Sequence, residues 1–322
     1  SMGSRLTIQV ARDYPLARDV CSYGYFLLAP NHWDVRAQAF HRVFELAEGP
    51  TRAVISQPPD ANKRGRAPRR GRTLRVTFDR ALTRAEQAEV RPLIARMLRL
   101  DEDAKTIAAY HKLDPRWKRS GRGRLLRSPT LFEDIVKTVT SCNVAWPSTV
   151  HMNRRLCEVV GRGGAFPTPA RLARARASTL RARCRVGYRD ARLIELAKRY
   201  RRGESDPVWC EDPATSDEDL RTFLLALPGI GPYAAANIMQ LLGRYADIPH
   251  DTESIRHGKA VLGLTGTDRQ ITRTMDAHYA PFGAHKFRSY WFELWEFYES
   301  KRGPAEDWDR EEVGASFTAS QL

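Results

Sequence analysis

A short segment rich in glycine and proline, residues 227–235, constrains the fold more than any other part of the chain. It follows an apolar helical pattern over residues 220–227 and carries Gly229 and Gly231 directly before Pro232. Glycine permits tight turns and proline is favoured in the first turn of a helix, so the segment predicts two helices joined by a hairpin. The N–H groups of such a turn, at the positive end of the second helix, can bind a phosphate group. The segment therefore predicts a clamp for a nucleic-acid backbone.

The overall charge favours the same kind of partner. Of the 322 residues, 53 are Lys or Arg and 38 are Asp or Glu, so the formal net charge is +15. Arginine-rich stretches at 116–127 and 171–185 supply charge that neutralises phosphates. An anionic membrane surface would also attract this charge, but no apolar run approaches the ~20 residues of a spanning helix and no basic amphipathic helix stands alone. We therefore expect a nucleic-acid partner and no membrane.

The cysteines indicate free thiols rather than disulfides or a metal site. Their number is odd and none forms a C-x-x-C pair, which is typical of a reducing compartment and disfavours structural zinc. We therefore expect a cytoplasmic protein associated with the nucleoid, or a nuclear protein if the source is eukaryotic. The five cysteines are Cys21, Cys142, Cys157, Cys184 and Cys210.

The first hundred residues have the pattern of a β-rich domain with one helix, which we place at residues 5–105. Between two of its strands lies an Arg-, Pro- and Gly-rich stretch, residues 58–72, which predicts a mobile hairpin tip. Thr83 and Glu86 have capping-box spacing and predict the start of the helix. The predicted strands are short β-prone runs at residues 23–28, 44–46, 53–56 and 73–78.

The rest of the chain is predicted to be helical. From Ser128 onward, apolar residues recur at helical intervals between turn signals, which indicates a second, helical domain that we place at residues 106–302. Residues 303–322 are polar with little periodicity and predict a disordered tail.

A second motif, His250-Asp251-Thr252, gives the hairpin a possible chemical role, because Asp251 lies eighteen residues after Tyr233. A Leu-Pro-Gly-x-Gly turn, a helix and then Asp-Thr at this spacing resemble the helix-hairpin-helix (HhH-GPD) superfamily of DNA glycosylases. Phe166-Pro167-Thr168-Pro169 and Gly187-Tyr188-Arg189 look like the 3-methyladenine glycosylase II and 8-oxoguanine glycosylase branches. The resemblance covers most of the chain and implies an α+β fold. A mainly helical glycosylase core in two subdomains would follow an N-terminal antiparallel β-sheet domain.

The resemblance implies a monofunctional DNA glycosylase that leaves an abasic site. Hydrolysis of an N-glycosidic bond builds positive charge on the sugar, and a nearby carboxylate stabilises that charge, which is the role implied for Asp251. A helix-capping role is the alternative for this aspartate. Tyr233 stands where relatives that also cut the strand have a lysine, and a phenol cannot form a Schiff base.

Other site residues are implied by the same resemblance, each with packing or solvation as its alternative. The base pocket would be lined by Tyr233, Asn237, Tyr290, Trp291 and Glu293, with Asn31, His32 and Trp33 as further candidates. DNA would be contacted by the turn residues Gly229, Ile230 and Gly231, by a wedge at Tyr188 and Arg189, and by Asn143 against the orphaned base.

The expected partner is double-stranded DNA with a damaged or modified base, bound by a monomer. No cysteine follows Cys210, so no iron–sulfur cluster is expected. We expect no required cofactor, and a monovalent cation at the hairpin is left open. Aromatic residues of the pocket suit a cationic alkylated purine, although the identity of the base stays open, and Glu253 stands where 8-oxoguanine glycosylase has a histidine. Two alternatives are a non-catalytic DNA-binding or lesion-sensing protein and an enzyme that acts on RNA or a hypermodified nucleotide.

Overall fold

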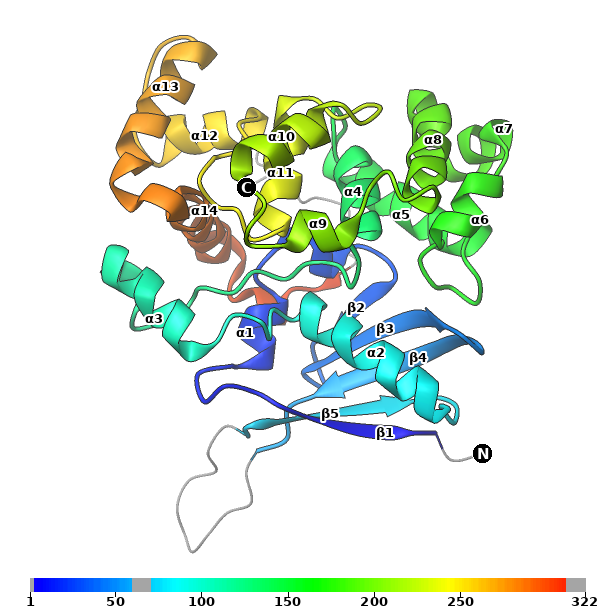
Figure 1. Ribbon diagram of the computed structural model, residues 1–322. Helices are drawn as coiled ribbons and strands as arrows, with labels where there is room; N and C mark the ends of the chain where they lie inside the picture. Colours follow the sequence, from blue (N-terminus) through cyan, green and yellow to red (C-terminus); the bar gives the residue numbers. More distant parts are fainter. Residues whose placement is uncertain (1–2, 60–70, 311–322) are drawn as a thin grey trace, which may run out of the picture.

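The N-terminal part of the protein forms a single antiparallel sheet. The computed structural model describes residues 3–59 and 71–310, and 60–70 of the predicted hairpin tip lie outside these ranges. The sheet is open, and α2 (Arg84–Met97) packs against it (Figure 1). In spatial order, its strands are β1 (Arg5–Gln9), β5 (Thr73–Phe78), β4 (Gly49–Ser56), β3 (Ala39–Leu46) and β2 (Asn31–Asp34).

Three of the four predicted strands are confirmed, and the fourth is wrong. In β4, buried and more exposed residues alternate, with Ala53 and Ile55 fully buried, as expected for a strand with one covered face. Residues 23–28 instead contain a 3-10 turn, η1 (Gly24–Leu27), that follows α1 (Leu16–Val20). Periodicity cannot separate a short apolar run in a strand from one in a buried turn.

The predicted capping box is confirmed at the start of α2. The Thr83 hydroxyl accepts the N–H of Glu86 at 3.1 Å, and the Glu86 carboxylate accepts the N–H of Thr83 at 3.1 Å. After α2, the chain continues through α3 (Ala104–Leu113) and η2 (Pro115–Trp117) into the helical part of the molecule.

The middle of the chain builds a helical subdomain with a core of its own, which includes Leu156, Leu193, Leu220 and Ile238. Two of its short turns, η3 (Leu180–Cys184) and η4 (Gly187–Arg189), precede a longer helix. Its helices are α4 (Leu131–Val139), α5 (Trp146–Val159), α6 (Pro169–Arg174), α7 (Ala177–Thr179), α8 (Asp190–Arg201), α9 (Pro207–Glu211), α10 (Asp217–Leu225) and α11 (Pro232–Leu241).

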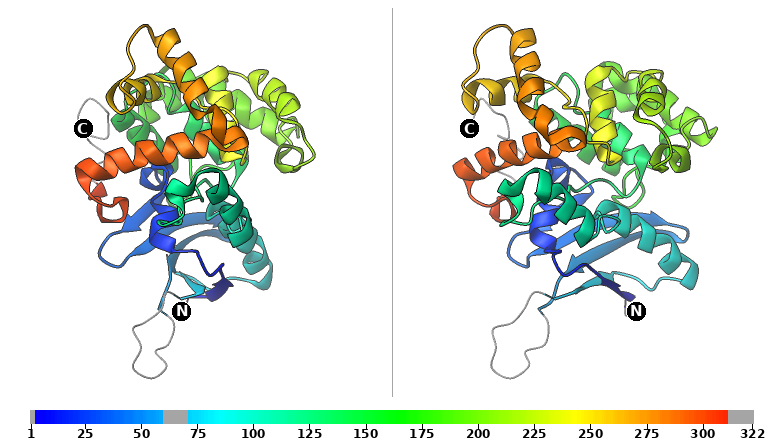
Figure 2. Two further views of the ribbon diagram at one scale, coloured as in Figure 1. Left: turned by 90° about the vertical axis from the view of Figure 1, so that its left-hand side faces the viewer. Right: turned by 60° about the vertical axis from the view of Figure 1, so that its left-hand side comes forward.

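The last helices return to the sheet. They are α12 (Thr252–Ala260), α13 (Asp268–Tyr279) and α14 (Lys286–Arg302), with η5 (Ala280–His285) between the last two, and Figure 2 shows α14 running alongside the N-terminal part. Residues of α13 and α14 share one apolar core with the sheet. Trp295 is fully buried, and its indole N–H donates to the carbonyl oxygen of Cys21 at 3.0 Å. The apolar cores therefore do not follow the predicted boundary at residue 105.

The expectation of a disordered tail is wrong for residues 303–310. This segment contains η6 (Ala305–Asp307), and Trp308 is buried with its ring 5.2 Å from that of Trp295. The carbonyl oxygen of Glu306 accepts the indole N–H of Trp33 at 2.9 Å. The mostly polar composition of the segment suggested disorder, but the single residue Trp308 packs it against the core. Residues 311–322 lie outside the described part.

Within the ranges that the structure describes, no helix has both the length and the apolar content needed to cross a bilayer.

Candidate active site

The helix-hairpin-helix is present as predicted, formed by α10, a six-residue turn and α11. Ile230 has only 5% of its surface exposed and anchors the turn in the core of the helical subdomain. Gly229 and Gly231 are exposed. Gly229 has a φ of +73°, a conformation that favours glycine, and a Cβ on Gly231 would meet nothing within 4 Å. The turn therefore presents bare backbone to the solvent at the N-terminus of α11.

Asp251 caps the N-terminus of α12 and is half-buried. Its Oδ1 accepts the N–H of Ser254 at 2.9 Å, while the Ser254 hydroxyl accepts the N–H of Asp251 at 3.0 Å. Burial raises the pKa of the Asp251 carboxyl to about 6, and the nearby Glu253 contributes in the same direction. Asp251 is therefore a helix cap, as the alternative interpretation predicted. A buried carboxyl group with a raised pKa is also typical of active sites, so the capping role does not exclude a catalytic one.

Two predicted pocket residues, Tyr233 and Tyr290, share the surroundings of Asp251. Tyr233 is half-buried in the first turn of α11, and Tyr290 is buried in α14. Burial raises the pKa of both phenols well above the ordinary value, and the Asp251 charge is the next largest cause for each. Both tyrosines are therefore neutral, and the structure brings them together with Asp251 from three different helices.

Asn237 lies one turn after Tyr233 on α11, and both polar atoms of its side-chain amide form hydrogen bonds. Its Oδ1 accepts the hydroxyl of Tyr23 at 2.9 Å, and its Nδ2 donates to Thr138 Oγ1 at 3.1 Å and to the Tyr25 hydroxyl at 3.3 Å. The ring of Trp291 lies 4.8 Å from that of Tyr23. In this arrangement Asn237 holds an aromatic residue of the sheet domain against α11.

Tyr23 is a site residue that the sequence prediction missed. Burial is the largest cause of its raised pKa, and the charges of Asp134 and, to a smaller extent, Asp251 act in the same direction. Its contacts with Asn237 and Trp291 bring it next to two predicted pocket residues. The available signal was the dense aromatic run that starts at Tyr23, which we interpreted as a strand.

The remaining predicted pocket residues contact other parts of the protein rather than Asp251. The Glu293 carboxylate accepts from Arg116 at 3.0 Å and from the Tyr279 hydroxyl at 3.1 Å. In β2, the Asn31 side chain accepts from Arg42 at 2.9 Å. Trp33 is buried with Glu306 as its partner, and His32 is exposed.

The predicted wedge residues lie beside the hairpin. Tyr188 is 51% exposed, and the guanidinium groups of Arg189 and Arg192 lie over its ring at 4.5 Å and 5.2 Å from the centroid. The Cδ atom of Arg192 is 2.8 Å from where a Cβ on Gly229 would stand. Tyr188 therefore projects from a basic surface that is continuous with the turn.

Arg189 is hydrogen-bonded to the backbone next to Asn143. Asn143 is exposed in a left-handed conformation, with a φ of +54°, in the loop between α4 and α5. Arg189 is buried and donates to the carbonyl oxygen of Val139 at 3.2 Å and to that of Cys142. Arg189 thus ties the wedge segment to the loop that carries Asn143, while its guanidinium is held by carbonyl oxygens.

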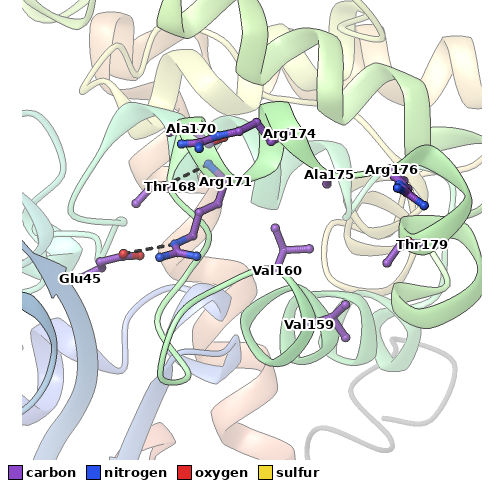
Figure 3. A pocket seen from close by; sticks show the side chains of 10 residues that line it. All are labelled: Glu45, Val159, Val160, Thr168, Ala170, Arg171, Arg174, Ala175, Arg176 and Thr179. Carbon is purple, nitrogen blue, oxygen red and sulfur yellow. Dashed lines mark hydrogen bonds and ion pairs between the residues drawn. The ribbon is translucent and has the colours of Figure 1, made fainter.

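Two surface cavities lie outside the Asp251 cluster. One, of about 360 Å³, borders the first turns of α11 and is lined by residues that include Pro232, His250, Asp276 and Lys286. The other, of about 610 Å³, is an arginine-lined groove between β3 and α5 to α7 (Figure 3), and it contains none of the predicted site residues. Its lining consists of Glu45, Val159, Val160, Thr168, Ala170, Arg171, Arg174, Ala175, Arg176 and Thr179.

Within residues 3–59 and 71–310, no group of three or more His, Cys, Asp or Glu side chains could hold a metal ion. The monovalent cation at the hairpin, which carbonyl oxygens would bind, stays a prediction.

Comparison with known proteins supports the fold independently of the motifs. No protein-family model matches the chain, and no curated protein matches it in sequence. Among solved structures, 3-methyladenine DNA glycosylase from Archaeoglobus fulgidus is similar, with a TM-score of 0.64, 17% identity, and coverage of 91% of this chain and 99% of that one. The apo 8-oxoguanine glycosylase/lyase of Clostridium acetobutylicum has a TM-score of 0.62 and 18% identity, with coverage of 91% and 99%. MBOgg1, solved with a low-affinity DNA ligand, has a TM-score of 0.65 and 17% identity, with coverage of 92% and 97%. This chain therefore has the α+β fold of the helix-hairpin-helix DNA glycosylases.

Proposed function

We propose that this protein is a DNA N-glycosylase that hydrolyses the glycosidic bond of a damaged or modified base flipped out of duplex DNA. The observation that carries the proposal is the position of Asp251. Its carboxyl group is half-buried near neutral tyrosines, at the N-cap of the helix that follows the helix-hairpin-helix, whose turn is exposed. A carboxylate shielded from water stabilises the positive charge that develops on the sugar more strongly than an exposed one.

The other parts of the site have matching roles in this proposal. The exposed N–H groups of the hairpin turn bind a phosphate next to the flipped nucleotide. Tyr188 enters the space that the base leaves in the duplex, and Asn143 meets the orphaned base. The ionised Asp251 stabilises the sugar cation while water attacks, so the products are a free base and an abasic site.

We further propose that the enzyme lacks lyase activity. Tyr233 occupies the lysine position of the lyase motif, and its phenol cannot form a Schiff base. Lys137 is fully buried and paired with Glu133 at 2.8 Å, which leaves it unsuited to attack a sugar. Lys286 lines the cavity beside the hairpin, so it is the first lysine to test for Schiff-base formation.

The aromatic side chains near Asp251 support an alkylated purine as the substrate. Tyr23, Tyr290 and Trp291 offer electron-rich rings, and a positively charged base is both attracted to such rings and a better leaving group. We therefore propose N-alkylated purines as the first class of substrate to test, with oxidised bases as the second.

The test is a panel of duplex oligonucleotides, each with one lesion. We expect release of free base and alkali-labile sites without direct strand cleavage, and loss of release in Asp251→Asn. Unchanged release by Asp251→Asn would refute the assignment of Asp251. A covalent adduct after borohydride treatment would refute the monofunctional assignment, and its loss in Lys286→Ala would identify the amine. Tight binding to abasic DNA without base release from any lesion would instead support a non-catalytic DNA-binding protein.

A further inference from the structure

His250, the residue before Asp251, connects the candidate active site to α13. Its Nε2 lies 2.9 Å from Asp276 Oδ1, and its Nδ1 lies 3.2 Å from the Ser254 hydroxyl. Ser254 is fully buried and is the capping partner of Asp251. An unbroken chain of hydrogen bonds therefore runs from a carboxylate on α13 to the cap of α12.

The direction of these hydrogen bonds follows from the donors available. The Asp276 carboxylate can only accept, so His250 carries a hydrogen on Nε2. In the neutral imidazole, Nδ1 is then an acceptor for the single hydrogen of the Ser254 hydroxyl, which also points to the carbonyl oxygen of Asp251 at 3.0 Å. The lone pairs of that hydroxyl accept the N–H of Asp251 at 3.0 Å, so His250 and the Asp251 backbone together hold the rotamer of Ser254.

The backbone conformation gives this chain a geometric consequence. Asp251 is extended, with φ and ψ of −149° and −169°, and successive side chains of an extended backbone point to opposite sides. His250 is directed to α13 and the cavity beside it, while Asp251 shares its surroundings with Tyr233 and Tyr290. His250 and the Asp251 carboxylate therefore have different neighbours, and Ser254 joins them, because its hydroxyl contacts His250 and its N–H donates to Asp251 Oδ1.

We propose that His250 and Asp276 are positioning residues that hold the Asp251 carboxylate in its reactive orientation through Ser254. The inference rests on the proposed function, because it assigns the orientation a role in base release. Neither residue is expected to touch the DNA base. Their removal should slow the chemical step and leave DNA affinity nearly unchanged.

A double-mutant cycle tests this coupling. In single-turnover assays, we expect His250→Ala and Asp276→Ala each to slow base release about tenfold, as for the loss of one orienting hydrogen bond. Because both act through the same chain, the double variant should be no slower than the slower single variant. The dissociation constant for duplex DNA with an abasic analogue should change less than about twofold.

Two further variants separate positioning from general damage to the structure. His250→Gln offers an amide oxygen and an N–H at a similar separation to the ring nitrogens, and should restore most of the lost rate. Asp247→Asn is the matched control, because Asp247 lines the same cavity but pairs with Arg221. It should release base at the wild-type rate. Multiplicative effects in the double variant, or equal losses in His250→Ala and His250→Gln, would overturn the proposal.

Amide hydrogen exchange provides a test that does not depend on activity. The Ser254 N–H donates to Asp251 Oδ1, so its exchange in His250→Ala should be about tenfold faster than in the wild type. If the wild-type protein released no base from any lesion, the proposed function would fail, and this measurement alone would decide whether His250 orders the cap. Unchanged exchange would show that it does not.

Discussion

At residue 251, the fold holds a carboxyl group where its charged form is disfavoured. Burial raises the pKa of Asp251 from 3.8 to about 6, so the folded state binds a proton more tightly than the unfolded state. The favourable contribution of this group to folding is complete below pH 4 and is lost as the pH rises through 6. Active sites commonly hold charged groups at such a cost to stability.

Asp251→Asn should therefore stabilise the protein while abolishing base release. Asparagine is an equally good N-cap and carries no charge, so we expect a gain of about 2–3 kcal/mol in the free energy of unfolding at pH 7.5. The gain should shrink as the pH falls from 6 and vanish below pH 4, where both side chains are neutral. Urea unfolding at several pH values measures this difference, and a variant less stable than the wild type at pH 7.5 would contradict the prediction.

The same ionisation should appear in the rate of base release. Because the reactive form of Asp251 is the carboxylate, we expect the single-turnover rate of the wild type to rise with pH to a plateau, with a midpoint of about 6. A rate that is independent of pH between 5 and 8 would indicate that another group carries the chemistry.

At the scale of elements, the two glycines of the hairpin turn have different roles: Gly231 serves binding, whereas Gly229 also serves folding. Gly231 has an ordinary φ of −92° and open space in front of it, whereas Gly229 has a φ of +73° and lies against Arg192. A methyl group at residue 231 therefore costs little in folding but obstructs the bare backbone. The same group at residue 229 strains the turn as well.

Gly231→Ala should weaken DNA binding without destabilising the protein. We expect about a tenfold higher dissociation constant for duplex DNA with an abasic analogue, because the methyl group hinders close approach of a phosphate. Its melting temperature should match that of the wild type. Gly229→Ala should bind weakly too and lose about 1–2 kcal/mol of stability, owing to the left-handed conformation. Fluorescence anisotropy and thermal unfolding measure the two effects, and equal melting losses in both variants would refute this division of roles.

The hairpin could be predicted from sequence because all its determinants are local. The glycines, the proline and the apolar helical pattern of the hairpin lie within some twenty residues of one another. Asp251 and its capping partner Ser254 are also close in sequence, three residues apart. Tyr23 could not be placed by such a pattern, since its position depends on Asn237, more than two hundred residues away. Arg189 was predicted to contact DNA from its motif alone, whereas its burial depends on the carbonyl groups at the end of α4.

At the scale of the whole molecule, the predicted α+β fold is confirmed, but the way in which its parts are joined was not predictable. The interface between the sheet and α4 contains a buried ionic cluster of Arg42, Glu133 and Lys137, with each side chain at most 4% exposed. The Glu133 carboxylate accepts from both cations, at 2.5 Å and 2.8 Å. No periodic pattern signals such a cluster, because a charged residue on an apolar face contradicts the pattern that defines a core.

Glu133→Gln should weaken the junction strongly because it leaves two buried cations without a counter-charge. Burial pushes the pKa of Glu133 up, but the charges of Arg42 and Lys137 outweigh it and hold the pKa at about 2. We expect a loss of about 3–5 kcal/mol in the free energy of unfolding at pH 7, as found when one partner of a buried ion pair is removed. The matched control is Glu158→Gln on the surface of α5, where Arg155 pairs with Glu158 at 2.7 Å and the loss should be below about 1 kcal/mol.

The pH dependence of this loss distinguishes a charge effect from a packing effect. Because the pKa of Glu133 is lowered in the folded state, the stabilisation it provides is present above pH 4.5 and is lost as the pH falls towards 2. The difference between the wild type and Glu133→Gln should therefore narrow steadily over that range. A difference that stayed constant down to pH 2 would mean that the glutamine disturbs packing, and that the ion pairs do not hold the sheet to α4.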